Sequence, residues 1–136
     1  MLGIPDADTA ENDSGSANSV ISPVSCAVPN RAPGAPKLSG GGRVCIEPSS
    51  LLHSIYGKLE TVEEYFCNYE VNPEYEPKFR AAGLRFTARG SQNEIRAAEI
   101  DGKRFFLATL FQPQLSSTAE QPHPVFLAYL RAIVGS

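Results

Sequence analysis

Phe105-Phe106-Leu107-Ala108-Thr109-Leu110-Phe111-Gln112-Pro113-Gln114 is the most informative part of the sequence for the architecture. Its residues up to Phe111 are apolar or small and uncharged, which predicts a central strand covered on both faces, as in a parallel or mixed α/β sheet. Pro113 ends the strand because it has no N–H to donate to a neighbour. Open α/β sheets place ligands and catalytic groups at strand ends, so a catalytic or ligand-binding site is expected at the corner formed by Gln112 and Gln114.

A family resemblance rests on four blocks of sequence. Phe111-Gln112-Pro113-Gln114 resembles the end of the last core strand of class I glutamine amidotransferase domains, which is Phe-His-Pro-Glu. Three further blocks resemble the version of this domain in the CTP synthase family, namely Tyr69-Glu70-Val71-Asn72, Ala82-Gly83-Leu84-Arg85 and Pro122-His123-Pro124-Val125-Phe126. The resemblance covers roughly residues 43 to 136 and, more weakly, the first ~25, and the four blocks keep the family's order at compatible spacing.

The resemblance implies an α/β fold, specifically the C-terminal part of a class I glutamine amidotransferase-like (flavodoxin-like) three-layer domain with a mixed central sheet. Residues 1–42 are expected to form an acidic loop, a short edge strand and a Pro/Gly-rich connector, and residues 43–136 the amidotransferase part. The 136 residues, of which 42% are hydrophobic, are sufficient for one domain with a modest core.

The first part of the chain has few strong signals of secondary structure. Val20 to Cys26 predicts a short strand, and Pro23 within it favours an edge position. Pro29 to Gly42 is rich in proline and ends in three glycines, which predicts a connector. A phosphate-binding loop is a weaker interpretation of these glycines, because the Lys-Ser/Thr pair of a P-loop does not follow them.

The second part has clearer patterns. We expect strands at residues 44–46, 61–71, 84–88, 94–100 and 105–111. We expect helices at residues 51–56, capped by Ser50 and ended by Gly57, and at residues 72–82, begun by Asn72-Pro73. A closing helix is predicted from Pro122 to Val134, with Phe126, Leu127, Leu130 and Val134 facing inward and His123 as a capping or packing residue.

The corner after residue 111 departs from the family at both catalytic positions. The family's His takes the proton from a nucleophilic Cys, and its Glu orients that His. These positions are Gln112 and Gln114 here, and a glutamine amide is not a base near neutral pH. We therefore predict no intact catalytic residue, and two amides that hydrogen-bond loop backbone instead.

The family's nucleophile lies on a Gly-x-Cys-x-Gly elbow, and this motif does not occur in the sequence. The spacing of the matching blocks places it upstream of Met1, so we expect a partial copy of the domain. The three cysteines, Cys26, Cys45 and Cys67, are odd in number and widely spaced, which favours reduced thiols over a disulfide framework or a zinc site.

A candidate ligand-binding wall lies at Cys67, Asn68 and Tyr69. In the family, the position of Asn68 is an Arg that helps to hold the substrate glutamine, because a guanidinium binds a carboxylate with two charge-assisted hydrogen bonds. Asn68 is neutral and shorter, which predicts poor support for a free amino acid. Cys67 is the only thiol near this wall and is the candidate for any residual covalent chemistry, but the favoured interpretation is a small buried hydrophobic residue.

Charge and hydropathy exclude several classes of function. The net charge is −3, no Lys/Arg cluster occurs, and no apolar run is long enough to span a bilayer. These features argue against nucleic-acid and membrane partners, and we expect a cytoplasmic protein with no metal site. The family's ATP and Mg²⁺ belong to a synthetase half that is not in this sequence, so we expect no cofactor in this chain.

Two hypotheses of function follow. In the first, the chain is a CTP synthase-like glutamine amidotransferase domain, from a family that aminates UTP to CTP with glutamine, and is a partial, glutaminase-inactive copy. In the second, it is a non-catalytic amidotransferase-like binding or regulatory module for a different small ligand or protein partner. The expected partners are the N-terminal part of the domain or a second copy of the chain, because an apolar strand needs a neighbour on each side.

Overall fold

The computed structural model describes residues 3–25 and 32–135, which form two sheets flanked by helices. The larger sheet has the strand order β4-β3-β6-β7-β8, and the smaller sheet has the order β1-β2-β5. The strands of the larger sheet are β3 (Leu38–Ile46), β4 (Glu60–Cys67), β6 (Leu84–Arg89), β7 (Ile95–Ile100) and β8 (Leu107–Thr109). Those of the smaller sheet are β1 (Asp8–Thr9), β2 (Ser19–Pro23) and β5 (Tyr69–Val71). The helices are α1 (Leu51–Tyr56), α2 (Glu76–Ala81) and α3 (Pro124–Val134), and single 3-10 turns form η1 (Pro73–Tyr75) and η2 (Pro113–Leu115).

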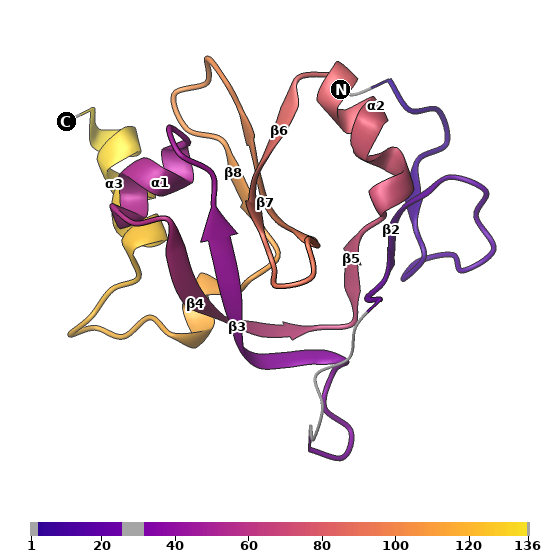
Figure 1. Cartoon of the computed structure of the whole chain (residues 1–136), viewed down its shortest axis with the longest axis horizontal. Coiled ribbons are helices and arrows are strands. Elements are labelled where there is room, and N and C mark those ends of the chain that lie inside the picture. Colours follow the sequence, from indigo (N-terminus) through magenta and orange to yellow (C-terminus); the bar gives the residue numbers. More distant parts are fainter. Residues whose placement is uncertain (1–2, 26–31, 136) are drawn as a thin grey trace.

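Helices lie on both sides of the larger sheet. α1 and α3 lie together on one side, and α2 lies on the other side, near β2 and β5 (Figure 1).

The core has two clusters of buried residues, one on each of these sides of the larger sheet. The cluster beside α1 and α3 contains Val24, Leu38, Val44, Ile46, Leu52, Tyr65, Ala88, Ala97, Phe111 and Val125. The cluster beside α2 contains Tyr75, Phe79, Phe86, Ile95 and Ala98. The predicted α/β class is confirmed; pairing is antiparallel within the larger sheet and parallel between β1 and β2.

Local signals placed the first two helices correctly. The Ser50 side chain accepts a hydrogen bond from His53 N at 2.9 Å and so caps α1, and Gly57 ends the helix at φ 65°. The Asn72 side chain accepts a hydrogen bond from Glu74 N at 3.1 Å and so caps η1, which continues into α2. The hairpin of β6 and β7 also forms where its sequence predicts it.

Two irregularities in the β6–β7 pairing direct side chains to opposite faces of the sheet. The register skips Thr87 on β6 and Arg96 on β7. Because of the extra residue, Phe86 packs in the cluster beside α2, whereas Ala88, only two positions later, packs in the cluster beside α1 and α3. The carbonyl of Thr87 accepts a hydrogen bond from Glu47 N at 2.8 Å, so its backbone is still satisfied.

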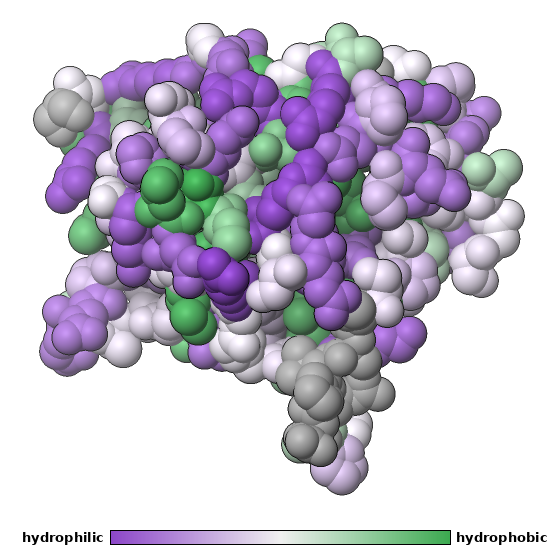
Figure 2. Space-filling view, viewed as in Figure 1, coloured by the Kyte–Doolittle hydropathy of each residue, from purple (hydrophilic) through white to green (hydrophobic). Residues whose placement is uncertain are grey.

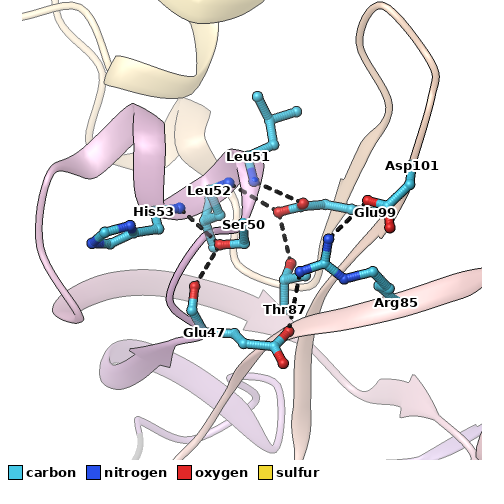
Figure 3. Close-up of polar contacts among 9 residues, drawn as sticks. All are labelled: Glu47, Ser50, Leu51, Leu52, His53, Arg85, Thr87, Glu99 and Asp101. Atoms are coloured by element: carbon cyan, nitrogen blue, oxygen red, sulfur yellow. Dashed lines mark hydrogen bonds and ion pairs between the residues drawn. The ribbon is translucent and has the colours of Figure 1, made fainter.

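A buried carboxylate joins β7 to α1 (Figure 3). The side chain of Glu99 is 3% exposed and accepts hydrogen bonds from Leu51 N at 2.8 Å and Leu52 N at 2.9 Å, at the first turn of α1. It also accepts one from the Thr87 hydroxyl at 2.8 Å. A negative charge is favourable beside the N–H groups that open a helix. Glu99 thus fixes the position of a helix that is too short to be stable alone.

The prediction of a central strand from Phe105 to Phe111 is wrong. β8 is three residues long, pairs only with β7, and lies at the edge of the larger sheet in the part of the chain described. Ala108 is exposed, and within this stretch only Phe111 is buried. The physical reason is that the chain leaves β7 after Leu110, whose N–H donates to the Arg96 carbonyl at 2.9 Å, and continues beside β4.

Two predictions for residues 1–42 are also wrong. β2 lies between β1 and β5, so within residues 3–25 and 32–135 it is the central strand of its sheet, and Pro23 is its last residue. The predicted connector contains the start of β3, because Gly40, Gly41 and Gly42 pair with β4. A Cβ on Gly42 would lie 2.8 Å from the ring of Tyr65, so close packing explains this glycine in a strand. The predicted strand residue Cys26 lies outside the described residues.

The orientation predicted for α3 is partly wrong. Phe126, Leu130 and Val134 are exposed, and Leu127 is half-buried. Val125 is buried instead, because α3 packs against α1. The role predicted for His123 is confirmed, since its ring Nδ1 accepts a hydrogen bond from Val125 N at 3.2 Å and caps α3.

We predict that Glu99→Ala lowers the free energy of unfolding by about 2–4 kcal/mol, since it leaves buried donors on α1 and Thr87 without an acceptor. Urea unfolding followed by circular dichroism measures this loss. Glu60→Ala is the matched control, because it removes a carboxylate from the exposed ion pair with Arg43 and should cost less than about 1 kcal/mol. Equal losses in the two variants would contradict the role assigned to Glu99.

Candidate functional site

The candidate corner lies where the chain passes from β8 to the edge of β4. Gln112 N donates to the Glu64 carbonyl at 2.8 Å, and the Gln112 side-chain amide donates to the Phe66 carbonyl at 3.2 Å. Gln112 is half-buried, and Pro113 behind it is buried. Gln114 is exposed on the turn η2. The Gln112 amide therefore serves as a backbone clamp on β4, next to Cys67.

Asn68 lies in the bend between β4 and β5, and its polar groups hold neighbouring loops. Its side-chain oxygen accepts a hydrogen bond from Lys37 N at 2.8 Å, and its carbonyl accepts one from Val24 N at 2.9 Å. The side-chain oxygen thus holds the segment before β3, and the carbonyl holds the segment after β2.

Cys67 is half-buried at the end of β4 and is a free thiol, as is Cys45 on β3. Burial raises the pKa of the Cys67 thiol above its ordinary value, and the nearby Glu70 carboxylate acts in the same direction. The positive charge of Arg96 lowers this pKa but does not outweigh burial. The thiolate, which is the reactive form, is therefore scarce near neutral pH.

Tyr69 faces a small apolar groove rather than the Gln112 side chain. The groove has a volume of about 190 Å³ and is lined by residues of β2 and β5 and of the paired strands β7 and β8. Its walls include Ile21, Tyr69, Val71, Ala98 and Leu110. The structure thus brings Gln112 beside the end of β4 but places Tyr69 in a different surface feature.

An ion-pair network behind this groove was not anticipated from the sequence. Arg96 is 4% exposed, and its guanidinium donates to Glu70 at 3.1 Å and to Glu94 at 2.8 Å. The other oxygen of Glu70 accepts hydrogen bonds from Ser25 N at 2.7 Å and the Ser25 hydroxyl at 2.8 Å. The guanidinium also lies over the ring of Tyr65, 5.4 Å from its centroid. This buried charge is therefore paired and hydrogen-bonded, as a buried charge must be.

A second buried network joins β4 to both helices on the α1 side. Glu63 Oε2 lies 3.0 Å from His123 Nε2, and Glu63 Oε1 accepts a hydrogen bond from the Tyr56 hydroxyl at 2.5 Å. Since His123 Nδ1 accepts from Val125 N, the ring proton of a neutral His123 is on Nε2 and points to Glu63. Burial, followed by the Glu63 hydrogen bond, raises the pKa of Tyr56. The sequence signal for this network was the alternation in β4, which buries Thr61, Glu63 and Tyr65 and exposes Val62 and Phe66.

The hydroxyl of Tyr65 is the one buried side-chain polar atom in the described residues that has no hydrogen-bond partner. Burial raises the pKa of this phenol, against the attraction of Arg96. Tyr65 is 2% exposed and packs over Gly42, so the phenol is held in place but has no route to solvent. It fills the core rather than a ligand site.

The described residues contain neither a cluster of metal-ligating side chains nor a helix suited to cross a membrane. Within residues 3–25 and 32–135, no group of three or more His, Cys, Asp or Glu side chains is placed to hold a metal ion. In the same ranges, no helix combines the length and the apolar composition that crossing a membrane requires.

The polar groups near the corner are suited to holding the fold more than to catalysis. Acyl transfer needs a nucleophile within hydrogen-bond reach of a base. The nearest thiol, Cys67, has a raised pKa, and the adjacent amide, Gln112, cannot accept its proton. Glu63 and His123 would suit proton transfer by type, but both are buried and already paired with each other.

Sequence comparisons relate the chain to CTP synthases, although no family model matches it. The CTP synthase of Caldivirga maquilingensis is 35% identical over 133 residues, which are 97% of this chain and 24% of the relative. That of Archaeoglobus fulgidus is 40% identical over 96 residues, 68% of this chain and 18% of the relative. That of Methanospirillum hungatei is 34% identical over 132 residues, 97% of this chain and 24% of the relative. The chain thus spans about a quarter or less of these relatives.

Structural comparison agrees with the sequence. The solved glutaminase domain of Trypanosoma brucei CTPS with bound acivicin matches with a TM-score of 0.86 and 30% identity, covering 100% of this chain and 53% of that chain. A putative GMP synthase protein from Thermoplasma acidophilum matches in fold, with a TM-score of 0.52 at 15% identity over 74% of this chain and 47% of that chain. The chain belongs with the glutaminase domains of the CTP synthase family, which are class I glutamine amidotransferase domains, as its four sequence blocks predicted.

Proposed function

We propose that this chain is a partial copy of a CTP synthase-like glutamine amidotransferase domain that does not itself hydrolyse glutamine. The family's role is the glutamine-dependent amination of UTP to CTP, and the similarity to glutaminase domains supports a place in that context. The observation that most supports inactivity is at the family's His position, where the Gln112 amide donates to the Phe66 carbonyl.

The Gln112 amide lacks the chemistry of a catalytic base. A catalytic base must offer a lone pair that takes a proton near neutral pH, and a carboxamide does not. Gln114, at the position of the family's Glu, is equally unable to stabilise a cation by its charge. Both changes remove charge from the same corner, so the proton-transfer unit is lost as a whole.

The described thiols do not replace the family's nucleophile. Neither Cys45 nor Cys67 has the two flanking glycines of the elbow, and both lie within strands rather than on a strand-to-helix turn. Burial keeps Cys67 protonated near neutral pH. A free glutamine would also lack the guanidinium that the family places at the position of Asn68, whose side chain is used to hold Lys37 N.

The proposal includes a partner of defined kind. Within the described residues β8 pairs with β7 alone, so its other edge is unpaired, and open apolar edges pair with other strands. The N-terminal part of an amidotransferase domain, or a second copy of this chain, fits that edge. ATP and Mg²⁺ are assigned to a synthetase half, and the cytoplasm to the site of action, by the family resemblance alone.

We predict that the purified chain releases no ammonia from glutamine above the rate in buffer. The variant Gln112→His with Gln114→Glu should remain inactive, because a base without an elbow nucleophile recovers little activity. A coupled glutamate dehydrogenase assay with millimolar glutamine measures the release. A folded CTP synthase glutaminase domain is the positive control, and glutamine-dependent ammonia release by this chain would refute the proposed inactivity.

We also predict that iodoacetamide labels Cys67 slowly at pH 7. Because its thiol pKa is raised, the labelling rate of Cys67 should reach half of its plateau at a higher pH in the folded protein than in the unfolded protein. Peptide mapping by mass spectrometry gives the rate at each cysteine, and unfolded protein in urea is the control for intrinsic reactivity. Fast labelling of Cys67 in the folded protein at pH 7, at or above its unfolded rate, would identify an activated thiol and contradict this prediction.

A further inference from the structure

Two arginines differ from the other arginines of the described residues, because neither has an ion-pair partner there. Five arginines pair with carboxylates, namely Arg43, Arg80, Arg85, Arg89 and Arg96. In residues 3–25 and 32–135, the side chains of Arg104 and Arg131 form neither an ion pair nor a hydrogen bond. Carboxylates outnumber cationic side chains in this chain, with 15 Asp and Glu against 12 Lys and Arg. Two unpaired arginines are therefore unusual for this protein.

Both arginines line one cleft. The cleft has a volume of about 510 Å³ and lies between α1, α3 and the segment that leads into β8. Its floor is apolar and includes Leu51, Ile55, Phe105 and Leu127, and no Asp or Glu is among its lining residues. A hydrophobic patch bordered by hydrophilic residues is visible on the side of the molecule that carries α1 and α3 (Figure 2). The volume is within the range of small-molecule sites.

Both arginines lie near the C-terminal end of α3. Arg104 Nη2 lies 3.1 Å from where a Cβ of Gly135 would stand, and Gly135 N donates to the Arg131 carbonyl at 3.1 Å. Both residues are thus at the last turn of α3, where the partial negative charge of a helix end favours cations. The helix end explains why positive charge is favourable at this place. It does not supply hydrogen-bond acceptors, and within the described residues the N–H groups of both guanidiniums have none.

We propose that this cleft is a binding site for a small amphipathic anion, with a carboxylate or phosphate head on an apolar body. The head fits the two arginines, because a guanidinium presents parallel N–H donors to two oxygens of either group. The apolar body fits the floor of Leu51, Ile55, Phe105 and Leu127, from which it displaces water. The site is separate from the Gln112 corner, so it is independent of the proposed loss of glutaminase activity.

The test is calorimetric titration of the full chain with four probes that separate the head from the body. Octanoate and octyl phosphate carry the body and either head, octan-1-ol carries the body alone, and acetate carries a head alone. We expect saturable binding of at least one of the two amphipathic anions, and binding at least about tenfold weaker for octan-1-ol and acetate, since each loses one half of the contact. The stronger of the two anionic probes identifies the preferred head group.

Variants then connect binding to the two arginines. Arg104→Gln and Arg131→Gln should each weaken the bound anion about tenfold while leaving octan-1-ol unchanged. Lys103→Gln is the matched control, because it removes a neighbouring exposed charge from outside the cleft lining and should not alter affinity. Circular dichroism verifies that each variant is folded, and Arg131→Lys, which keeps the charge, should retain part of the affinity.

Three results would overturn the proposal. The first is the absence of saturable heat with both amphipathic anions. The second is equal affinity for octanoate and octan-1-ol, which would show that the floor binds apolar molecules without regard to charge. The third is wild-type affinity in folded Arg104→Gln and Arg131→Gln variants, which would leave the helix end as the complete explanation for these cations.

Discussion

The Glu99 carboxylate is the interaction on which the arrangement of sheet and helices depends. A charge buried at 3% exposure is unfavourable unless hydrogen bonds replace its lost hydration, and Glu99 has three such bonds from two elements. Two come from the start of α1 and one from Thr87 on β6, so α1 can adopt one position against the sheet. α3 packs on α1, so its position depends indirectly on the same carboxylate.

The irregular register of β6 and β7 lies next to this interaction and shapes the sheet around it. The extra residues at Thr87 and Arg96 leave each without a partner in the ladder, and each backbone carbonyl instead accepts an N–H from outside the hairpin. Arg96 O binds Leu110 N, and two residues later Gln112 N binds Glu64 O. The segment from Leu110 to Gln112 therefore connects the β7 side of the sheet with β4 at the opposite edge, and the sheet curls accordingly.

Local sequence signals predicted the elements whose causes are local. Ser50, Gly57 and Asn72 form caps through their own side chains or their own φ angle, and they were correctly assigned. The glycines before Arg43 were not, because they belong to β3 through pairing with β4, whose residues lie more than twenty positions away in the sequence. An apolar strand such as β8 gives no local sign of whether it lies at the centre or the edge of a sheet. The assignment of the candidate site to Gln112 and Asn68 came from the family resemblance and stays a prediction. The buried ion pairs around the candidate site could not be predicted from local sequence. The partners in the pairs Arg96–Glu70 and His123–Glu63 are separated by 26 and 60 residues.

Whether a polar group near the corner is catalytic or structural depends on what its atoms bind. A catalytic group keeps an atom available for the substrate, whereas a structural group has its atoms satisfied by the protein. The Gln112 side-chain nitrogen donates to the Phe66 carbonyl, and the Asn68 side-chain oxygen accepts from Lys37 N. Both positions are catalytic or substrate-binding in the family, and here both side chains hold backbone. Because Gln112 ties the segment after β8 to the edge of β4, an amide at the position of the base contributes directly to the curl of the sheet, which a base reserved for a substrate proton would not do.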